Sequence, residues 1–228
     1  MPVTVRTVFP DELGGLGCVL LLPMREGSGT SVSDLSGYNN HGTLVGPPTW
    51  VDGRYGKCLS FNGTSDYVDV KHSASLAFTK EDFSIELWVY LNILTTTNPF
   101  AKGTDVTEGY WLNIRDSGRF DLVTSQAGAQ QTTSSALGAV GAASWYHLVA
   151  TRVGSVGKVY SQGLNITNSS ESHIDPAFST LSGKIGRHGS AAASYLDGLI
   201  DSVRIYNRAL SADEVLAHFL GTRYLKVR

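Results

Sequence analysis

Residues 195–215, near the end of the chain, read Tyr195-Leu-Asp-Gly-Leu-Ile-Asp-Ser-Val-Arg-Ile-Tyr-Asn-Arg-Ala-Leu-Ser-Ala-Asp-Glu-Val215. Side chains alternate between the two faces of a strand, so residues 199–206 predict a strand in which Asp201 shares a face with Leu199, Val203 and Ile205. A carboxylate in an apolar row is costly unless it is paired, hydrogen-bonded or bound to a cation. The sequence therefore predicts a partner for Asp201 elsewhere in the chain.

A short helix is predicted directly after this strand. Ser211 and Glu214 have the spacing of a capping box, in which each side chain bonds the backbone N–H of the other residue. The apolar residues Val215, Leu216 and Phe219 follow at helical spacing. We therefore expect one helix over about residues 209–220.

Strand signals recur along the rest of the chain, separated by clusters of Gly, Asn, Asp, Ser and Pro. They lie at residues 16–22, 67–70, 84–91, 110–114, 119–123, 145–152, 156–162 and 184–186. The sequence Asp116-Ser-Gly118 predicts a hairpin between two of them. Residues 126–143, rich in Ala, Gly, Ser, Thr and Gln, are expected to form a long loop or an irregular strand pair. This spacing predicts an all-β sandwich and not alternating strands and helices.

Composition excludes several classes of partner. The chain has 228 residues, a net charge of −2 and no basic cluster, so we expect no nucleic-acid partner. The apolar run at residues 16–22 is too short to span a bilayer and lacks a basic flank, so neither membrane insertion nor a signal peptide is predicted. Cys18 and Cys58 lie in apolar strand contexts and fit either two buried thiols or a disulfide.

The acidic residues do not predict an active site. Glycoside hydrolysis needs two carboxylates that flank one bond. Of Glu81, Asp82 and Glu86, only Glu86 lies well inside a predicted strand, and its neighbours on the same face carry no carboxylate. His147 alternates with apolar residues and is expected to be packed or hydrogen-bonded, and the scattered histidines do not predict zinc. We expect no enzyme activity, no catalytic residue and no organic cofactor.

Four segments, in this order, carry a resemblance to a known family. They are Asp34-Leu-Ser-Gly-Tyr-Asn-Asn-His-Gly-Thr-Leu44, Gly56-Lys-Cys-Leu-Ser-Phe-Asn-Gly63, Trp145-Tyr-His-Leu-Val-Ala150 and residues 195–215. From Gly17 to Leu220 the chain resembles the laminin-G-like jelly rolls of the concanavalin A-like lectin/glucanase superfamily. The resemblance implies a two-sheet antiparallel jelly-roll sandwich with one short C-terminal helix.

This resemblance divides the chain into three parts. Residues 17–220 form the expected jelly-roll domain, residues 1–16 a strand-like N-terminal arm and residues 221–228 a strand-like C-terminal tail. We expect the core to include Leu20, Phe61, Leu87, Val89, Leu148, Val203 and Ile205.

The resemblance also implies a structural calcium ion between the early Asp-rich loop and the late strand. Matched residue by residue, its ligands would be Asp34, Asn40 and Asp201, and hard oxygen ligands suit Ca²⁺ better than a transition metal. The alternative needs no metal: Asp34 caps the Ser36-Gly37 turn and Asp201 pairs with an arginine.

Two functions remain. The resemblance implies a non-catalytic binding or adhesion module of lectin-like type, with a glycan or a surface protein as its partner. Trp50, Trp111 and Tyr195 are candidate platforms for stacking on a sugar, although each also fits core or loop packing. An extracellular, cell-surface or virion-surface location is favoured, without a recognisable export signal.

The alternative function is a structural one. The protein would be a decoration or fibre component of a virus particle or surface assembly. The apolar residues of the arm, Val3, Val5, Val8 and Phe9, fit either an edge strand added to their own sheet or, under this alternative, pairing with a neighbouring copy in a homo-oligomer, because an unpaired strand edge is a template for another chain.

Overall fold

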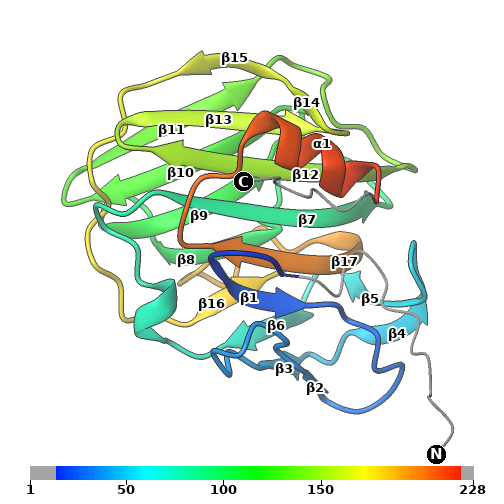
Figure 1. Cartoon of the computed structure of the whole chain (residues 1–228). Helices are drawn as coiled ribbons and strands as arrows, with labels where there is room; N and C mark the ends of the chain where they lie inside the picture. Colours follow the sequence, from blue (N-terminus) through cyan, green and yellow to red (C-terminus); the bar gives the residue numbers. More distant parts are fainter. Residues whose placement is uncertain (1–13, 222–228) are drawn as a thin grey trace, which may run out of the picture.

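A computed structural model of the chain describes residues 14–221, which form two antiparallel sheets that pack face to face (Figure 1). This confirms the predicted all-β jelly-roll sandwich. Residues 1–13 and 222–228, which carry nearly all of the predicted arm and tail, lie outside the described residues. Self-association through those ends therefore stays a prediction.

The first sheet has eight strands. In spatial order they are β14 (Leu164–Asn165), β13 (Val156–Ser161), β12 (Trp145–Val153), β7 (Phe83–Leu91), β17 (Asp197–Tyr206), β5 (Lys57–Asn62) and β4 (Thr49–Asp52), and β1 (Cys18–Leu22) also pairs with β17.

The second sheet has nine strands. In spatial order they are β15 (Thr167–Ser170), β11 (Ala129–Ser135), β10 (Phe120–Gln126), β9 (Glu108–Ile114), β8 (Phe100–Thr104), β16 (Gly183–Ile185), β6 (Tyr67–Val70), β3 (Gly42–Val45) and β2 (Ser31–Val32). The predicted hairpin at Asp116-Ser-Gly118 connects β9 and β10, and Gly118 has the positive φ of 73° that this turn requires.

The core lies between the two sheets, where each strand contributes alternate side chains. All seven residues that were predicted to be buried belong to it, and none is more than 1% exposed: Leu20, Phe61, Leu87, Val89, Leu148, Val203 and Ile205. Each such side chain contributes about 1.5–3 kcal/mol to stability when fully buried. The predicted core is confirmed.

Strand β17 corrects one prediction about Asp201. A register shift between Asp201 and Arg204, with Ser202 at a φ of 51°, inserts one residue into the strand. The bulge reverses the alternation, so Val203 enters the core while Asp201 lies opposite Trp88 on the outer side. The prediction that Asp201 shares a face with Val203 and Ile205 is therefore wrong.

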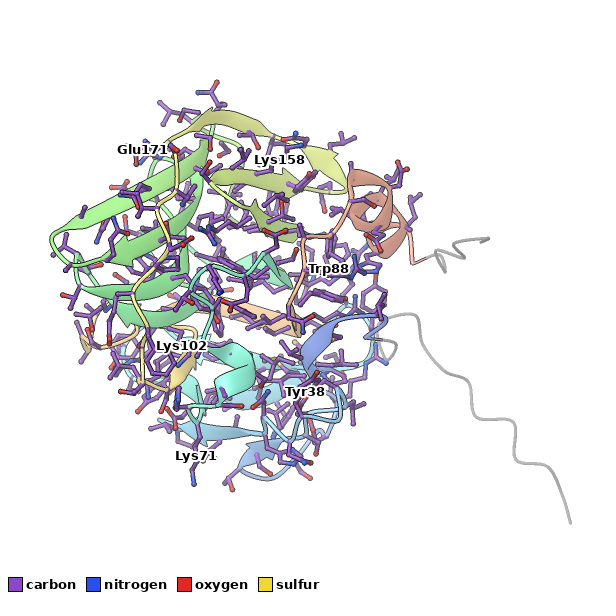
Figure 2. All side chains as sticks on the ribbon, turned by 60° about the vertical axis from the view of Figure 1, so that its left-hand side comes forward. Tyr38, Lys71, Trp88, Lys102, Lys158 and Glu171 are labelled. Carbon is purple, nitrogen blue, oxygen red and sulfur yellow. The ribbon has the colours of Figure 1, made fainter. Side chains whose placement is uncertain are left out.

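The predicted helix is confirmed as α1 (Ala212–Phe219), with both bonds of the Ser211–Glu214 capping box present. It packs on the outer face of the eight-stranded sheet, where the Phe219 ring stacks on Trp88 at 5.9 Å between ring centroids. Figure 1 shows α1 in front of β12 and β7, and Figure 2 labels Trp88 on the side where α1 lies.

A long irregular segment joins two strands of the nine-stranded sheet. The strap, residues 171–182, connects β15 to β16 without regular secondary structure and runs along the side of the sandwich (Figure 1). The His173 ring hydrogen-bonds the hydroxyls of Thr124 and Thr133, and Lys102 donates to the strap carbonyls of Ser179 and Leu181. These contacts fix the strap to the interior of the nine-stranded sheet.

The cysteines are free thiols, both buried. Burial raises the pKa of each, Cys18 and Cys58, to about 12. Neither thiol is therefore a reactive nucleophile at neutral pH.

Candidate functional site

The outer face of the nine-stranded sheet is identified by strand register. Lys184 lies opposite both Asp69 and Ala101, and Ala101 lies opposite Trp111. Cross-strand partners share a face, and their neighbours in sequence, such as Phe100 and Tyr110, belong to the core. We call this outer surface, across β6, β16, β8, β9 and β10, the open face, because α1 packs on the other sheet.

An ion pair between Lys184 and Asp69 lies on the open face. The Lys184 ammonium contacts the Asp69 carboxylate and lies 5.2 Å from the centroid of the Tyr67 ring. The two charged side chains are 15% and 22% exposed. They are held by neighbouring strands and remain within reach of a ligand.

Arg187 extends this group toward a loop. Its guanidinium carbon lies 4.6 Å from the centroid of the Tyr67 ring and 5.7 Å from that of Tyr195, and its Nη1 donates to the Tyr195 hydroxyl at 3.3 Å. Arg187 Nε also donates to the carbonyl of His188 at 3.0 Å. The arginine thus fixes two half-buried tyrosine rings on one face. We call Tyr67, Asp69, Lys184, Arg187 and Tyr195 the tyrosine–arginine cluster.

Trp111 supports this loop from below. It is 2% exposed, and its ring and the His188 ring are arranged edge to face, with 6.0 Å between their centroids. The loop of residues 186–196 lies close on β8: a Cβ added to Gly189 would come within 2.3 Å of the Gly103 carbonyl oxygen. Trp111 and Tyr195 therefore lie on the same face, where Trp111 is buried beneath the loop and Tyr195 is half-buried at the surface.

Trp50 lies elsewhere. It belongs to β4 of the eight-stranded sheet, packs against the core and donates its indole N–H to the Gly29 carbonyl at 3.1 Å. These contacts match the core-packing alternative for this residue.

Sequence reasoning missed four members of the cluster: Tyr67, Asp69, Lys184 and Arg187. The alternation of residues 67–70 already placed Tyr67 and Asp69 on the face opposite Val68 and Val70. The pairing of β6 with β16, which joins segments about 115 residues apart, had no signal in the sequence.

The opposite outer face holds a buried charge network. Glu86 Oε1 accepts from His147 Nε2 and Arg204 Nη1, each at 2.9 Å, and Oε2 accepts from His218 Nδ1 of α1 at 2.9 Å. Burial alone raises the pKa of Glu86, but the Arg204 charge, with His218 and the bond from His147, holds it well below its usual value. Glu86, which also accepts from His147, therefore holds α1 against the sheet through His218.

The three predicted calcium ligands have separate partners. Both Asp34 oxygens already accept two donors each, from the backbone N–H groups of Leu21, Ser36 and Asn40 and from the Ser36 hydroxyl. Asp201 Oδ2 instead accepts from the backbone N–H groups of Arg54 and Tyr55.

Asn40 turns its side-chain NH₂ toward the Val19 carbonyl and the Ser75 hydroxyl. The N–H and O–H donors around Asp34 and Asp201 occupy the oxygens that a shared ion would need, so these residues do not fit such an ion. Asp34 makes the turn contacts of the metal-free alternative. Calcium binding itself stays a prediction. Within residues 14–221 no group of three or more His, Cys, Asp or Glu side chains could hold a metal ion.

None of the helices in the described part of the chain is both long and apolar enough to cross a bilayer.

Comparisons with known proteins agree with this architecture. A laminin-G family model, described as the concanavalin A-like lectin/glucanases superfamily, matches residues 62–216. A search of curated proteins found no match to the chain.

Solved structures share the fold. The binding domain of paraclostridial mosquitocidal protein 1 has a TM-score of 0.73 at 20% identity, over 89% of this chain and 52% of the other. Botulinum neurotoxin type C, whose cell entry depends on interaction with two ganglioside molecules, has a TM-score of 0.70 at 15% identity, over 91% of this chain and 52% of the other. Domain 4 of the arabinanase AbnA from Geobacillus stearothermophilus, in complex with arabinotriose, has 0.64 at 22% identity, over 87% and 96%.

The chain spans about half the length of the two toxin structures and nearly all of the arabinanase domain. At these identities the structures show a common fold. The family model covers more than half of the chain, including β7, β12 and β17. The chain therefore belongs to the concanavalin A-like lectin/glucanases superfamily.

Proposed function

We propose that the protein is a non-catalytic, lectin-like module that binds carbohydrate on its open face, at the tyrosine–arginine cluster. One observation carries the proposal: Arg187 holds the rings of Tyr67 and Tyr195 beside the Lys184–Asp69 ion pair, on the face that α1 leaves open. The arabinotriose complex of the arabinanase domain and the ganglioside interaction of the neurotoxin support the same class of ligand.

The chemistry of the cluster suits a sugar. A pyranose ring offers apolar C–H groups on one face, which pack on an aromatic ring such as Tyr195 or Tyr67. Its hydroxyls both donate and accept, so Asp69 can accept from one hydroxyl while Lys184 donates to another. The ion pair is already formed, so little ordering entropy is lost when a ligand binds.

Binding without catalysis follows from the placement of the acids. Asp69 is the one carboxylate of the cluster, and a glycosidase needs two that flank the scissile bond. Glu86, the acidic residue inside a strand, is buried beneath α1 with both oxygens hydrogen-bonded. The cluster can therefore hold a sugar and has no acid–base pair to cleave it.

A glycan array probed with the full chain tests the proposal. We expect binding to a defined set of glycans, and Tyr195→Ala should weaken it about tenfold through the loss of ring packing. Tyr38→Ala is the matched control, because Tyr38 is an exposed tyrosine on the loop of residues 34–41, away from the open face (Figure 2).

Two results would overturn the proposal. One is binding to no glycan, and the other is that Tyr67→Ala and Tyr195→Ala each bind glycans as strongly as the unmodified protein does. A protein that ignores every glycan but forms a stable oligomer in light scattering would instead support the structural-assembly alternative.

A further inference from the structure

A second charged group lies on the open face, on β10. Asp121 is 0% exposed and lies opposite Asn113 on β9 and Ser134 on β11. Two arginines enclose its carboxylate: Arg115 Nε donates to Oδ2 at 2.6 Å, and Arg119 Nε lies 3.0 Å from Oδ1. One buried carboxylate therefore orients two guanidinium groups.

Both arginines come from one hairpin. Arg115 and Arg119 close the β9–β10 turn, with the Arg115 N–H donating to the Arg119 carbonyl at 2.9 Å. Gly118 lies so close to its surroundings that an added Cβ would come within 2.5 Å of the Val140 carbonyl oxygen. The turn is thus held in place, and the two arginines start from fixed positions.

The guanidinium groups keep donors for a ligand. Their side chains are 36% and 35% exposed, although the carboxylate between them is fully buried. Asp121 engages the Nε of each arginine and, at 3.5 Å, Nη2 of Arg119. Among residues 14–221, none accepts a hydrogen bond from either Nη of Arg115 or from Nη1 of Arg119.

The arginines of this group outnumber the carboxylates that they contact. Two guanidinium groups contact the one carboxylate of Asp121, and Asp116, the other acidic residue of the turn, is exposed and makes no ion pair with either arginine among the described residues. Planar guanidinium groups with parallel N–H donors match the geometry of carboxylates and of sulfate or phosphate groups. The shared chemistry is that of an oxyanion.

The two groups on the open face are connected through short contacts. Ser194, next to Tyr195, accepts from the Asn98 backbone N–H at 3.1 Å, and Asn98 Nδ2 donates to Asn113 Oδ1 at 2.7 Å. Asn113 is the cross-strand partner of Asp121. From β16 to β10 is three strand spacings, or about 14 Å.

We propose that Arg115 and Arg119 form an anion subsite, and that the ligand of the open face is an acidic glycan whose carboxylate or sulfate group binds there. The inference rests on the proposed glycan binding and deepens it. The tyrosine–arginine cluster packs against the sugar rings, and the two arginines select the charge. Asp121 is a positioning residue, since it orients the arginines without touching the ligand.

The test uses an array of matched pairs with the full chain: sialylated and asialo glycans, oligogalacturonates and their methyl esters, sulfated and unsulfated glycosaminoglycan fragments. We expect each bound acidic glycan to exceed its neutral counterpart by at least about tenfold. Comparing the oligogalacturonate pairs with the sulfated pairs shows whether the subsite binds a carboxylate or a sulfate group. Arg119→Gln and Arg115→Gln should each remove most of that preference while binding to the neutral partners stays unchanged.

Asp121→Asn separates a built subsite from general charge attraction. It makes the protein more positive, so nonspecific attraction to anions would increase. We expect the acidic preference to fall, because the arginines lose their fixed orientation. If this variant fails to fold, Arg119→Lys keeps the charge, removes the planar fork and should also reduce the preference.

The outcomes are distinct. Binding to neutral and acidic members alike, or an acidic preference that survives Arg115→Gln and Arg119→Gln, would overturn the anion subsite and leave the proposed function standing. Binding to no glycan would overturn both. Weaker binding to all glycans in Tyr195→Ala, with the acidic preference retained, would support both.

Discussion

The two outer faces of the sandwich each bury one carboxylate against arginine, yet they treat it differently. On the eight-stranded sheet, Glu86 and Arg204 are both buried, and His218 of α1 closes the network. On the nine-stranded sheet, Asp121 is buried but Arg115 and Arg119 are about one-third exposed. The same pairing therefore stabilises a docked helix on one face and presents donors to solvent on the other.

The role of each buried carboxylate depends on whether a helix packs over its arginine partners. Under α1 the arginine has no water to replace a lost partner, so the charge network serves stability. On the open face water can solvate the arginines, so the same chemistry is free to serve recognition.

The largest expected effect tests this contrast through stability. Glu86→Gln removes the buried carboxylate charge that Arg204 and His218 contact and should cost about 3–5 kcal/mol. Asp121→Asn should cost about 1 kcal/mol, since its arginines can turn to water. Urea denaturation of the two variants measures both values, and equal losses would contradict the distinction between the faces.

The stability of the whole fold is expected to fall in acid, because His173 is buried in its neutral form. Burial, helped by the Arg152 charge, lowers the pKa of His173 to about 4, below its unfolded value of about 6.5. Neutral His173 thus stabilises the fold above pH 6.5, and about 3 kcal/mol of that stability should be lost as the pH falls from 6.5 to 4.

Denaturation curves between pH 7 and pH 4 measure this loss. His173→Gln should flatten the pH dependence. Thr124→Val removes the hydroxyl that contacts His173 Nδ1 but keeps the histidine, so it should lower stability at every pH and keep the slope. A wild-type slope in His173→Gln would assign the acid sensitivity to another group.

A smaller effect is expected from the loop that builds the open face. Gly189→Ala would force a Cβ against the Gly103 carbonyl oxygen and lift residues 186–196 from β8. We expect about tenfold weaker glycan binding with a stability loss of about 1–2 kcal/mol. Gly141→Ala, where the nearest atom is the tip of the Tyr146 side chain, is the matched control and should leave binding unchanged.

The smallest effect is expected from chelation. The Asp34 carboxylate is satisfied by four hydrogen bonds, so adding EDTA should shift the melting temperature by less than about 1 °C. A fall of several degrees, abolished in Asp201→Ala, would support the shared calcium ion that the family resemblance implies.

The parts of the fold that the sequence predicted are those with a strong local pattern. The apolar alternation of β7 and the Ser211–Glu214 capping box each specify an element without distant partners. Strand β11 lies in the stretch that was expected to be a long loop or an irregular strand pair, because Gln131 and Thr133 carry no apolar signal, although they pair in unbroken register with β10. The bulge at Ser202 likewise has no Gly or Pro to mark it.

The candidate site was predicted only in part, and for the same reason. Trp111 and Tyr195 are conspicuous as aromatic residues, whereas Arg187 gains its role from contacts with Tyr67, about 120 positions away in the chain. Arg115 and Arg119 flank a turn that was predicted correctly, but their common partner Asp121 emerges only when the hairpin folds back. Nonlocal pairing creates the site, and single-residue patterns do not encode it.

Hydrogen–deuterium exchange with and without a glycan selected on the array shows which outer face of the sandwich binds the ligand. We predict slower exchange in residues 111–123 and 184–196, which belong to the open face, and unchanged exchange in α1 and β7. Protection of α1 and β7 with no change on the open face would contradict this prediction, because the ligand would then bind the face that we assign to stability.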